Sequence, residues 1–122
     1  MEMWFSEFHT PDVKHSIRVN RQLFSRQSDY QRIDIFETPE FGRVLTLDGN
    51  VMLTERDEFI YDEMITHVPM AIHKEAKEIM VIGAGDGGVV RELTRYDRVS
   101  HIDLVEICLL YTSDAADDLT RV

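Results

Sequence analysis

The feature that most constrains this chain is a glycine loop set between a short apolar strand and a helical segment. Residues 79–82 (IMVI) form a continuous apolar run, which is typical of a strand buried on both faces of a parallel sheet. The loop GAGDGG follows at residues 83–88, residues 89–96 have a helical pattern, and residues 100–106 predict a second strand. This order predicts the first β-α-β step of a nucleoside-binding, Rossmann-like domain.

The region before the glycine loop has two different periods. Strand-like alternation predicts strands over residues 15–19, 30–37, 42–47 and 50–54, with Ile33 and Ile35 on one face. Asp48-Gly49 separates the last two strands and is a strong signal for a tight hairpin, because glycine tolerates the positive φ of such turns. We therefore expect a small antiparallel sheet.

A helical period follows over residues 55–73. We expect Thr54 to cap this helix, with Asp57 and Glu58 in its first turn, and Pro69 to kink it or to start a second short piece. The apolar residues that recur at spacings of three and four, and so predict its core face, are Ile60, Tyr61, Met64, Ile65, Val68 and Ala71.

These patterns define the expected fold class and domains. The class is α/β, with a small N-terminal antiparallel β domain at residues 1–54. The truncated start of a Rossmann-like, adenosylmethionine-methyltransferase-like domain follows at residues 55–107, and residues 108–122 form a tail without a matching pattern. A doubly wound sheet needs several more strands, so we expect the sequence to be a fragment.

The composition indicates which binding partners and which cellular compartment to expect. The formal net charge is −10, with 23 Asp and Glu against 13 Lys and Arg, which argues against a nucleic-acid partner. No apolar run approaches the roughly 20 residues that a membrane helix needs, and the N-terminus lacks the pattern of a signal peptide. A single cysteine, Cys108, suits a reducing compartment, so a cytoplasmic location is expected.

Two acids indicate which ligand the glycine loop favours. Glu106 ends the second strand, where an acid usually binds the ribose hydroxyls. Asp86 lies inside the loop and would repel a pyrophosphate by roughly 1–4 kcal/mol at contact distance, whereas it would attract a cation. The loop therefore favours an adenosyl sulfonium ligand over a dinucleotide. Asp86 could also cap the following helix, and capping is compatible with ligand contact.

A second acidic group lies at residues 55–63, where five carboxylates surround Phe59 and Tyr61. Carboxylates at the ends and aromatic surface along the methylenes would suit a flexible diamine. Spacing alone favours a solvated helix face. His67 and His73 have no partner at metal-ligand spacing, so no metal site is predicted.

Longer motifs resemble the spermidine synthases, the polyamine aminopropyltransferase family. They are residues 28–31 (SDYQ), 41–49 (FGRVLTLDG), 54–64 (TERDEFIYDEM), 67–69 (HVP), 83–88 (GAGDGG) and 105–107 (VEI). The resemblance implies a small β domain before a Rossmann-like catalytic domain, and a homo-oligomeric full-length enzyme. It also implies transfer of an aminopropyl group from decarboxylated S-adenosylmethionine, as co-substrate, to putrescine. The products are spermidine and methylthioadenosine, and neither a metal nor another cofactor is expected.

The resemblance assigns residues position by position. It implies a donor site of Gln31, Leu47, Gly83, Gly85, Asp86 and Glu106, and an amine-acceptor site of Tyr61, Asp62 and Asp86. This reverses the interpretation of residues 55–63 as a solvated face.

The resemblance also has gaps. The family's general base lies in a later Asp-Ser/Thr-x-Asp-Pro loop, so no catalytic residue is assigned here and the 122-residue chain itself is expected to be inactive. Ala84 replaces a usual glycine, and Cys108 stands where an acid is usual. Two alternatives stay open: an adenosylmethionine-dependent methyltransferase, and a non-catalytic binding or oligomerisation fragment.

Overall fold

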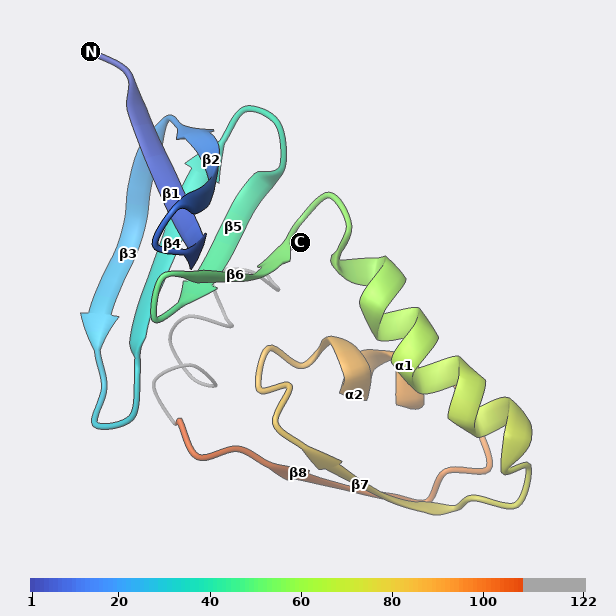
Figure 1. Cartoon of the computed structure of the whole chain (residues 1–122). Coiled ribbons are helices and arrows are strands. Elements are labelled where there is room, and N and C mark those ends of the chain that lie inside the picture. The colour runs from blue at the N-terminus through green and yellow to red at the C-terminus, as the bar shows by residue number, and fades with distance from the viewer. Residues whose placement is uncertain (109–122) are drawn as a thin grey trace. The chain divides into compact units, whose positions relative to one another are not determined.

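The computed structural model describes residues 1–108 (Figure 1). They divide into two compact units between Asp57 and Glu58, here called unit 1 and unit 2, and each is described by itself. Unit 1 consists of β1 (Met3–Thr10), β2 (Val13–Val19), β3 (Arg21–Gln27), β4 (Arg32–Thr38), β5 (Gly42–Leu47) and β6 (Asn50–Thr54). Apart from Cys108, the predicted tail lies outside the described residues.

Unit 1 is antiparallel throughout. β1 pairs with β2 as a hairpin, and β3, β4, β5 and β6 form a four-stranded sheet in chain order. The predicted Asp48-Gly49 hairpin is confirmed, because both residues have positive φ (50° and 80°) and they join β5 to β6. The four predicted strands are also confirmed. β1 and β3 were not predicted.

The core of unit 1 lies in its two central strands. Ile33 and Ile35 of β4 and Leu45 of β5 are fully buried, as the alternation predicts. Asp34, between the two isoleucines, is buried on the opposite face, where it accepts hydrogen bonds from Gln22 Nε2 (2.8 Å) and Arg32 Nε (2.9 Å). A buried carboxylate needs such donors, and here they come from β3 and from β4 itself.

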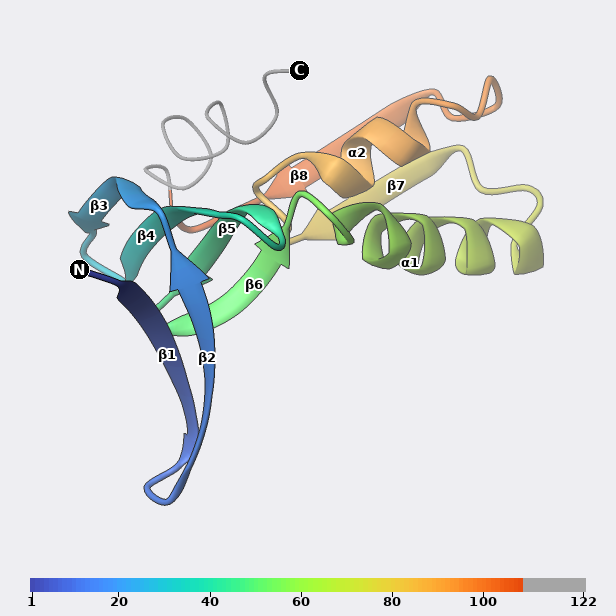
Figure 2. The ribbon, with the colours of Figure 1, turned by 90° about the horizontal axis from the view of Figure 1, so that it is seen from above.

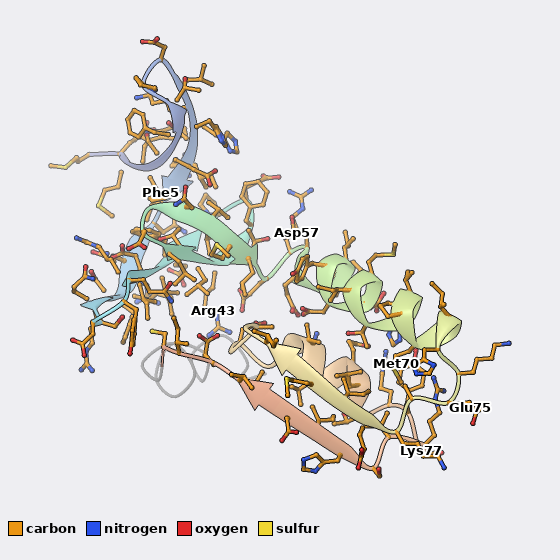
Figure 3. The ribbon with its side chains drawn as sticks, turned by 60° about the horizontal axis from the view of Figure 1, so that its bottom comes forward. Phe5, Arg43, Asp57, Met70, Glu75 and Lys77 are labelled. Carbon is orange, nitrogen blue, oxygen red and sulfur yellow. The ribbon has the colours of Figure 1, made fainter. Side chains whose placement is uncertain are left out.

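Both strands of the β1–β2 hairpin contact the four-stranded sheet, β2 at β4 and β1 at β6. The ring of Phe5 in β1, labelled in Figure 3, packs on the ring of Phe36 in β4, with the two centroids 5.1 Å apart.

Unit 2 contains α1 (Glu58–Ile72), β7 (Glu78–Ile82), α2 (Gly88–Leu93) and β8 (His101–Val105). β7 and β8 are parallel, in the register that pairs Ile82 with Val105, so the predicted β-α-β step is confirmed. Its core is the buried group of Met70, Val89 and Leu93, which packs against Ile79, Val81 and Ile102 of the strands. Figure 2 shows α2 along the strand pair with α1 beside it, and Met70 lies on the side of α1 that faces the sheet (Figure 3).

The predicted core face of α1 is wrong for the described residues. The buried residues are Asp62, Thr66 and Met70, one row at spacings of four. The residues predicted as the core face are exposed: Ile60, Tyr61, Met64, Ile65, Val68 and Ala71. Apolar residues occupy most of the surface of α1, so their spacing does not identify the side that packs against α2.

The predicted start and break of α1 also need correction. Thr54 does not cap the helix, because it lies in β6 and its Oγ1 hydrogen-bonds Asp57 Oδ1 at 2.6 Å. Glu58 does lie in the first turn. Pro69 starts no second helix, and α1 continues through it to Ile72.

The prediction that β7 is buried on both faces is wrong within residues 1–108. Ile79 and Val81 face the helices, whereas Met80 and Ile82 are 62% and 80% exposed. The reason is that α1 and α2 pack on one face of the β7–β8 pair.

We predict that Leu45→Ala destabilises unit 1 by about 2–5 kcal/mol, because it leaves a cavity between fully buried neighbours. The change is measurable by urea unfolding followed by the fluorescence of Trp4, the chain's only tryptophan, which lies in β1. Leu23→Ala, on the more exposed strand β3, is the matched control and should change the free energy of unfolding by less than about 1 kcal/mol. Equal losses in the two variants would contradict this core.

Candidate binding site

The glycine loop leaves β7 through left-handed backbone conformations. Gly83, Ala84 and Gly87 have φ of 81°, 55° and 86°. The Gly83 N–H donates to the Val105 carbonyl at 2.8 Å, so the loop begins while the strands are still paired. Ala84 holds a conformation that disfavours a Cβ by roughly 1 kcal/mol, while its methyl packs against the core of unit 2.

Asp86 lies at the end of this loop, just before α2. Its Oδ2 accepts a hydrogen bond from the N–H of Gly88, the first residue of α2, at 3.3 Å. The N-cap position of α2 is held by Gly87 and carries no side-chain cap, so Asp86 bonds the start of the helix without being its N-cap. The side chain is half-buried. A carboxylate has several acceptor positions, so this bond is compatible with ligand contact.

Asp62 reaches the same place from α1. Its carboxylate lies so close to the Gly88 Cα that a Cβ built there would be 2.0 Å from Oδ2. Only glycine leaves room for this approach. Asp62 is 3% exposed, so α1 and α2 meet at a buried carboxylate beside the glycine loop.

Two further charged groups surround Asp62. Arg91 Nη2 lies 3.3 Å from Glu58 Oε1 and 3.4 Å from Asp62 Oδ2. Burial raises the pKa of Asp62 to about 8, aided by a hydrogen bond with Glu58 and by the charges of Asp86 and Glu58, and opposed by Arg91. Near neutral pH this carboxyl is therefore largely protonated, and a cationic ligand would favour its ionised form.

Glu58, Asp62 and Asp86 form one group, here called the acidic cluster. One oxygen of each lies within 4.8 Å of the others. Carboxylate oxygens at this separation can bind an ammonium group or a metal ion. The expected absence of a metal site stays a prediction.

The other predicted residues of unit 2 lie at the same edge of the strand pair or nearby. Glu106 directly follows β8, and the parallel register places it beside Gly83. Its carboxylate accepts hydrogen bonds from the N–H groups of Ile107 (2.8 Å) and Cys108 (3.1 Å). Gly85 is buried in the loop. Tyr61 is 63% exposed while its neighbour Asp62 is buried, so the two side chains leave α1 in different directions.

Gln31 and Leu47 belong to unit 1, at one end of the four-stranded sheet. Leu47 pairs with Ile33 across β4 and β5. The backbone of Gln31 is held in a turn, in which its N–H donates to Ser28 Oγ at 3.0 Å. The roles of both residues stay predictions.

Sequence reasoning missed Gly88 and Arg91 as site residues. Gly88 carried a signal, because the second glycine of a Gly-Gly pair at a helix start marks close approach of another segment. Arg91 carried none, since its contacts with Glu58 and Asp62 span about 30 positions of the chain.

His67, for which the sequence predicts no metal-ligand role, links α1 to Glu92 of α2. Its Nδ1 lies 2.6 Å from Tyr96 Oη, and its Nε2 lies 3.0 Å from Glu92 Oε2. Burial would raise the pKa of Glu92, but hydrogen bonds from His67 and the charge of Arg95 outweigh it and lower the pKa. This interaction stabilises the helix pair away from the acidic cluster.

We predict that Asp62→Asn becomes more stable relative to the unsubstituted chain as pH rises from about 4 to 9. The folded state raises the pKa of Asp62 from 3.8 to about 8. Its contribution to stability is therefore complete below pH 4 and is lost as pH rises to about 8, whereas asparagine does not titrate.

The measurement is urea unfolding at several pH values, followed at amide NMR signals of α1 and α2. Asp97→Asn replaces an exposed aspartate of the same unit and serves as the control. The difference in free energy of unfolding between this variant and the unsubstituted chain should not show the change with pH expected for Asp62→Asn. A constant difference for Asp62→Asn would show that Asp62 is charged throughout.

Family comparisons agree with this geometry. A family model described as the spermidine synthase tetramerisation domain matches residues 3–55, and one described as the spermine/spermidine synthase domain matches residues 58–108. The chain is 61% identical over 107 residues to a polyamine aminopropyltransferase of Lachnoclostridium phytofermentans, covering 88% of this chain and 38% of that protein. It is 52% identical over 126 residues to one from Lachnospira eligens, covering 98% and 44%.

Solved structures give the same result. Spermidine synthase from Thermotoga maritima matches with a TM-score of 0.90 and 45% identity, covering 95% of this chain and 41% of that one. A spermidine synthase in complex with the transition state analogue AdoDATO has the same TM-score and identity, with 40% of that chain covered. Within the part of the chain that the structure describes, no helix is long and apolar enough to cross a membrane. The chain spans less than half the length of these relatives, and it belongs to the spermidine synthase family of polyamine aminopropyltransferases.

Proposed function

We propose that this chain is the N-terminal part of an enzyme that transfers an aminopropyl group from decarboxylated S-adenosylmethionine to putrescine. The products are spermidine and methylthioadenosine. The observation that carries the proposal is the acidic cluster beside the glycine loop, in a chain of this family. Both substrates are cations, and three carboxylates within 4.8 Å of one another favour cations over the pyrophosphate of a dinucleotide.

The donor occupies the glycine loop in this proposal. Gly83 and Gly85 leave room for the adenosyl group, and Glu106 accepts hydrogen bonds from the ribose hydroxyls. Asp86 binds the amine of the aminopropyl group. The family resemblance also assigns Gln31 and Leu47 to donor binding, and these two roles stay predictions.

The acceptor diamine occupies the acidic side of the same site. Asp62 and Asp86 bind its ammonium end, and Tyr61 contacts its methylenes. Asp62 is buried, and burial raises its pKa to about 8. A cation bound beside this carboxyl would therefore favour its ionised form and gain a close ion pair.

The reaction is a direct displacement at carbon. The deprotonated amine attacks the methylene next to the sulfonium, the C–S bond breaks, and methylthioadenosine leaves with the bonding electron pair. The attacking nitrogen then loses a proton to a base, which the family resemblance places beyond residue 107. This displacement needs neither a metal nor a redox cofactor, so the protein contributes alignment and charge.

The chemistry is testable in a chimera, because the chain spans 38% of the length of its Lachnoclostridium relative. Residues 1–107 of this chain are joined to the part of that relative that follows its matching segment. We predict spermidine formation, and a roughly 10- to 100-fold loss of kcat/KM in Asp86→Asn, the range expected for a lost charge-assisted contact.

Asp97→Asn, an exposed aspartate of the same unit, is the matched control and should leave kcat/KM near its original value. Methyl transfer from S-adenosylmethionine in place of aminopropyl transfer would contradict the proposal. Equal activity in the two variants would contradict the role of Asp86.

The domains have separate roles in this proposal. Residues 1–54 contribute the contacts between copies in a homo-oligomer, and residues 55–107 begin the catalytic domain. The name of the family model matching residues 3–55 supports this, as do large exposed side chains on the β1–β2 hairpin. These side chains are Met3, Trp4, Phe8 and Val13, at 43%, 56%, 62% and 54% exposure. We also propose a cytoplasmic location, which the single cysteine supports.

We predict that Phe8→Asp lowers the mass of the assembled chimera in sedimentation analysis, because a charge would be buried between apolar surfaces. Ile72→Asp places the same charge on an exposed residue of unit 2 and should leave the mass unchanged. An unchanged mass in Phe8→Asp would remove the hairpin from the contact between copies.

A further inference from the structure

Arg91 forms ion pairs with carboxylates of both α1 and α2. Its Nη2 contacts Glu58 and Asp62 of α1, at 3.3 Å and 3.4 Å, and its Nε lies 3.5 Å from Glu92 Oε1 on α2. The guanidinium is therefore held by carboxylates on both of its ends. Unlike a flexible lysine, a planar guanidinium bound at two ends has little freedom to turn away.

The groups that face Asp62 come from three segments. Glu58 lies one turn earlier on α1, Asp86 comes from the glycine loop, and Arg91 comes from α2. The two acids and burial favour a proton on Asp62, and Arg91 is the group that opposes them. Because a guanidinium stays protonated throughout the working range of pH, this opposition is constant.

We propose that Arg91 is a positioning residue, whose guanidinium holds the Asp62 carboxylate against Gly88 and allows it to take the negative charge that binds the acceptor amine. The inference rests on the proposed function, because it assigns Asp62 to the amine-acceptor site. Arg91 itself contacts neither substrate in this arrangement. Its effect on the reaction passes through Asp62.

The first test measures Asp62 directly in the 122-residue chain, by the carboxyl carbon NMR titration of that side chain. Arg91→Gln removes the charge but keeps much of the length of the side chain, and should raise the midpoint of the Asp62 titration by about one pH unit. Arg91→Lys keeps a charge and should raise it by less.

Arg95→Gln is the matched control for this titration. Arg95 lies two residues after the end of α2 and forms an ion pair with Glu92 Oε2 at 2.9 Å. Its substitution should leave the Asp62 midpoint in place. Amide spectra of each variant identify any loss of the fold, and Arg91→Lys keeps the test decisive if Arg91→Gln does not fold.

The second test measures the pH dependence of kcat/KM for putrescine in the chimera. In Arg91→Gln, the pH at which kcat/KM falls on the acidic side of the profile should rise by as much as the Asp62 midpoint rises. This shift lowers kcat/KM roughly tenfold at pH 7. The profiles should converge at pH values above both midpoints. A merely structural role would lower kcat/KM by one factor at every pH.

The two tests separate this inference from the proposed function. An unmoved Asp62 midpoint in both Arg91 variants overturns the inference, whatever the chimera does. A moved midpoint with an unmoved pH profile also overturns it, because Arg91 would then act on Asp62 without effect on the reaction. An unsubstituted chimera that forms no spermidine contradicts the proposed function, and the inference then fails with it as a statement about amine binding.

Discussion

The contact between the Asp62 carboxylate and Gly88 is the interaction on which the site in unit 2 depends. Helices usually pack through apolar ridges, but the buried row of α1 begins with an acid and a threonine and only then reaches Met70. The missing Cβ of Gly88 lets the carboxylate approach the start of α2. As a result, a charged group of α1 lies beside the loop that leaves β7.

This arrangement stabilises the fold less than an apolar contact would. Three carboxylates within 4.8 Å of one another repel, and burial adds to the free energy of ionising Asp62. The unit offsets the repulsion locally, through the guanidinium of Arg91 and the proton held on Asp62. Other contacts between the helices compensate, chiefly the buried Met70, Val89 and Leu93. Such a conflict between local stability and charge is typical of binding sites.

The features that could be predicted from the sequence are those determined by nearby residues. The Asp48-Gly49 hairpin and the strand–loop–helix step follow from backbone preferences of glycine and from short apolar runs, and the structure confirms them. β3 was missed because it is mostly polar and exposed, so no alternation marks it. The packed face of α1 and the role of Arg91 depend on contacts between segments some 30 residues apart, which periodicity does not reveal.

The same charges link ligand binding to the stability of unit 2. In the absence of ligand, the acids that favour cations also repel one another, and Asp86 acts on Asp62 while it accepts a hydrogen bond from the first N–H of α2. A bound ammonium group would lower this repulsion, and so would stabilise the folded helix pair by the same free energy that it contributes to binding. Selectivity for cations and dependence of the fold on a cation therefore have a common origin, because both arise from carboxylates that the close approach at Gly88 brings together.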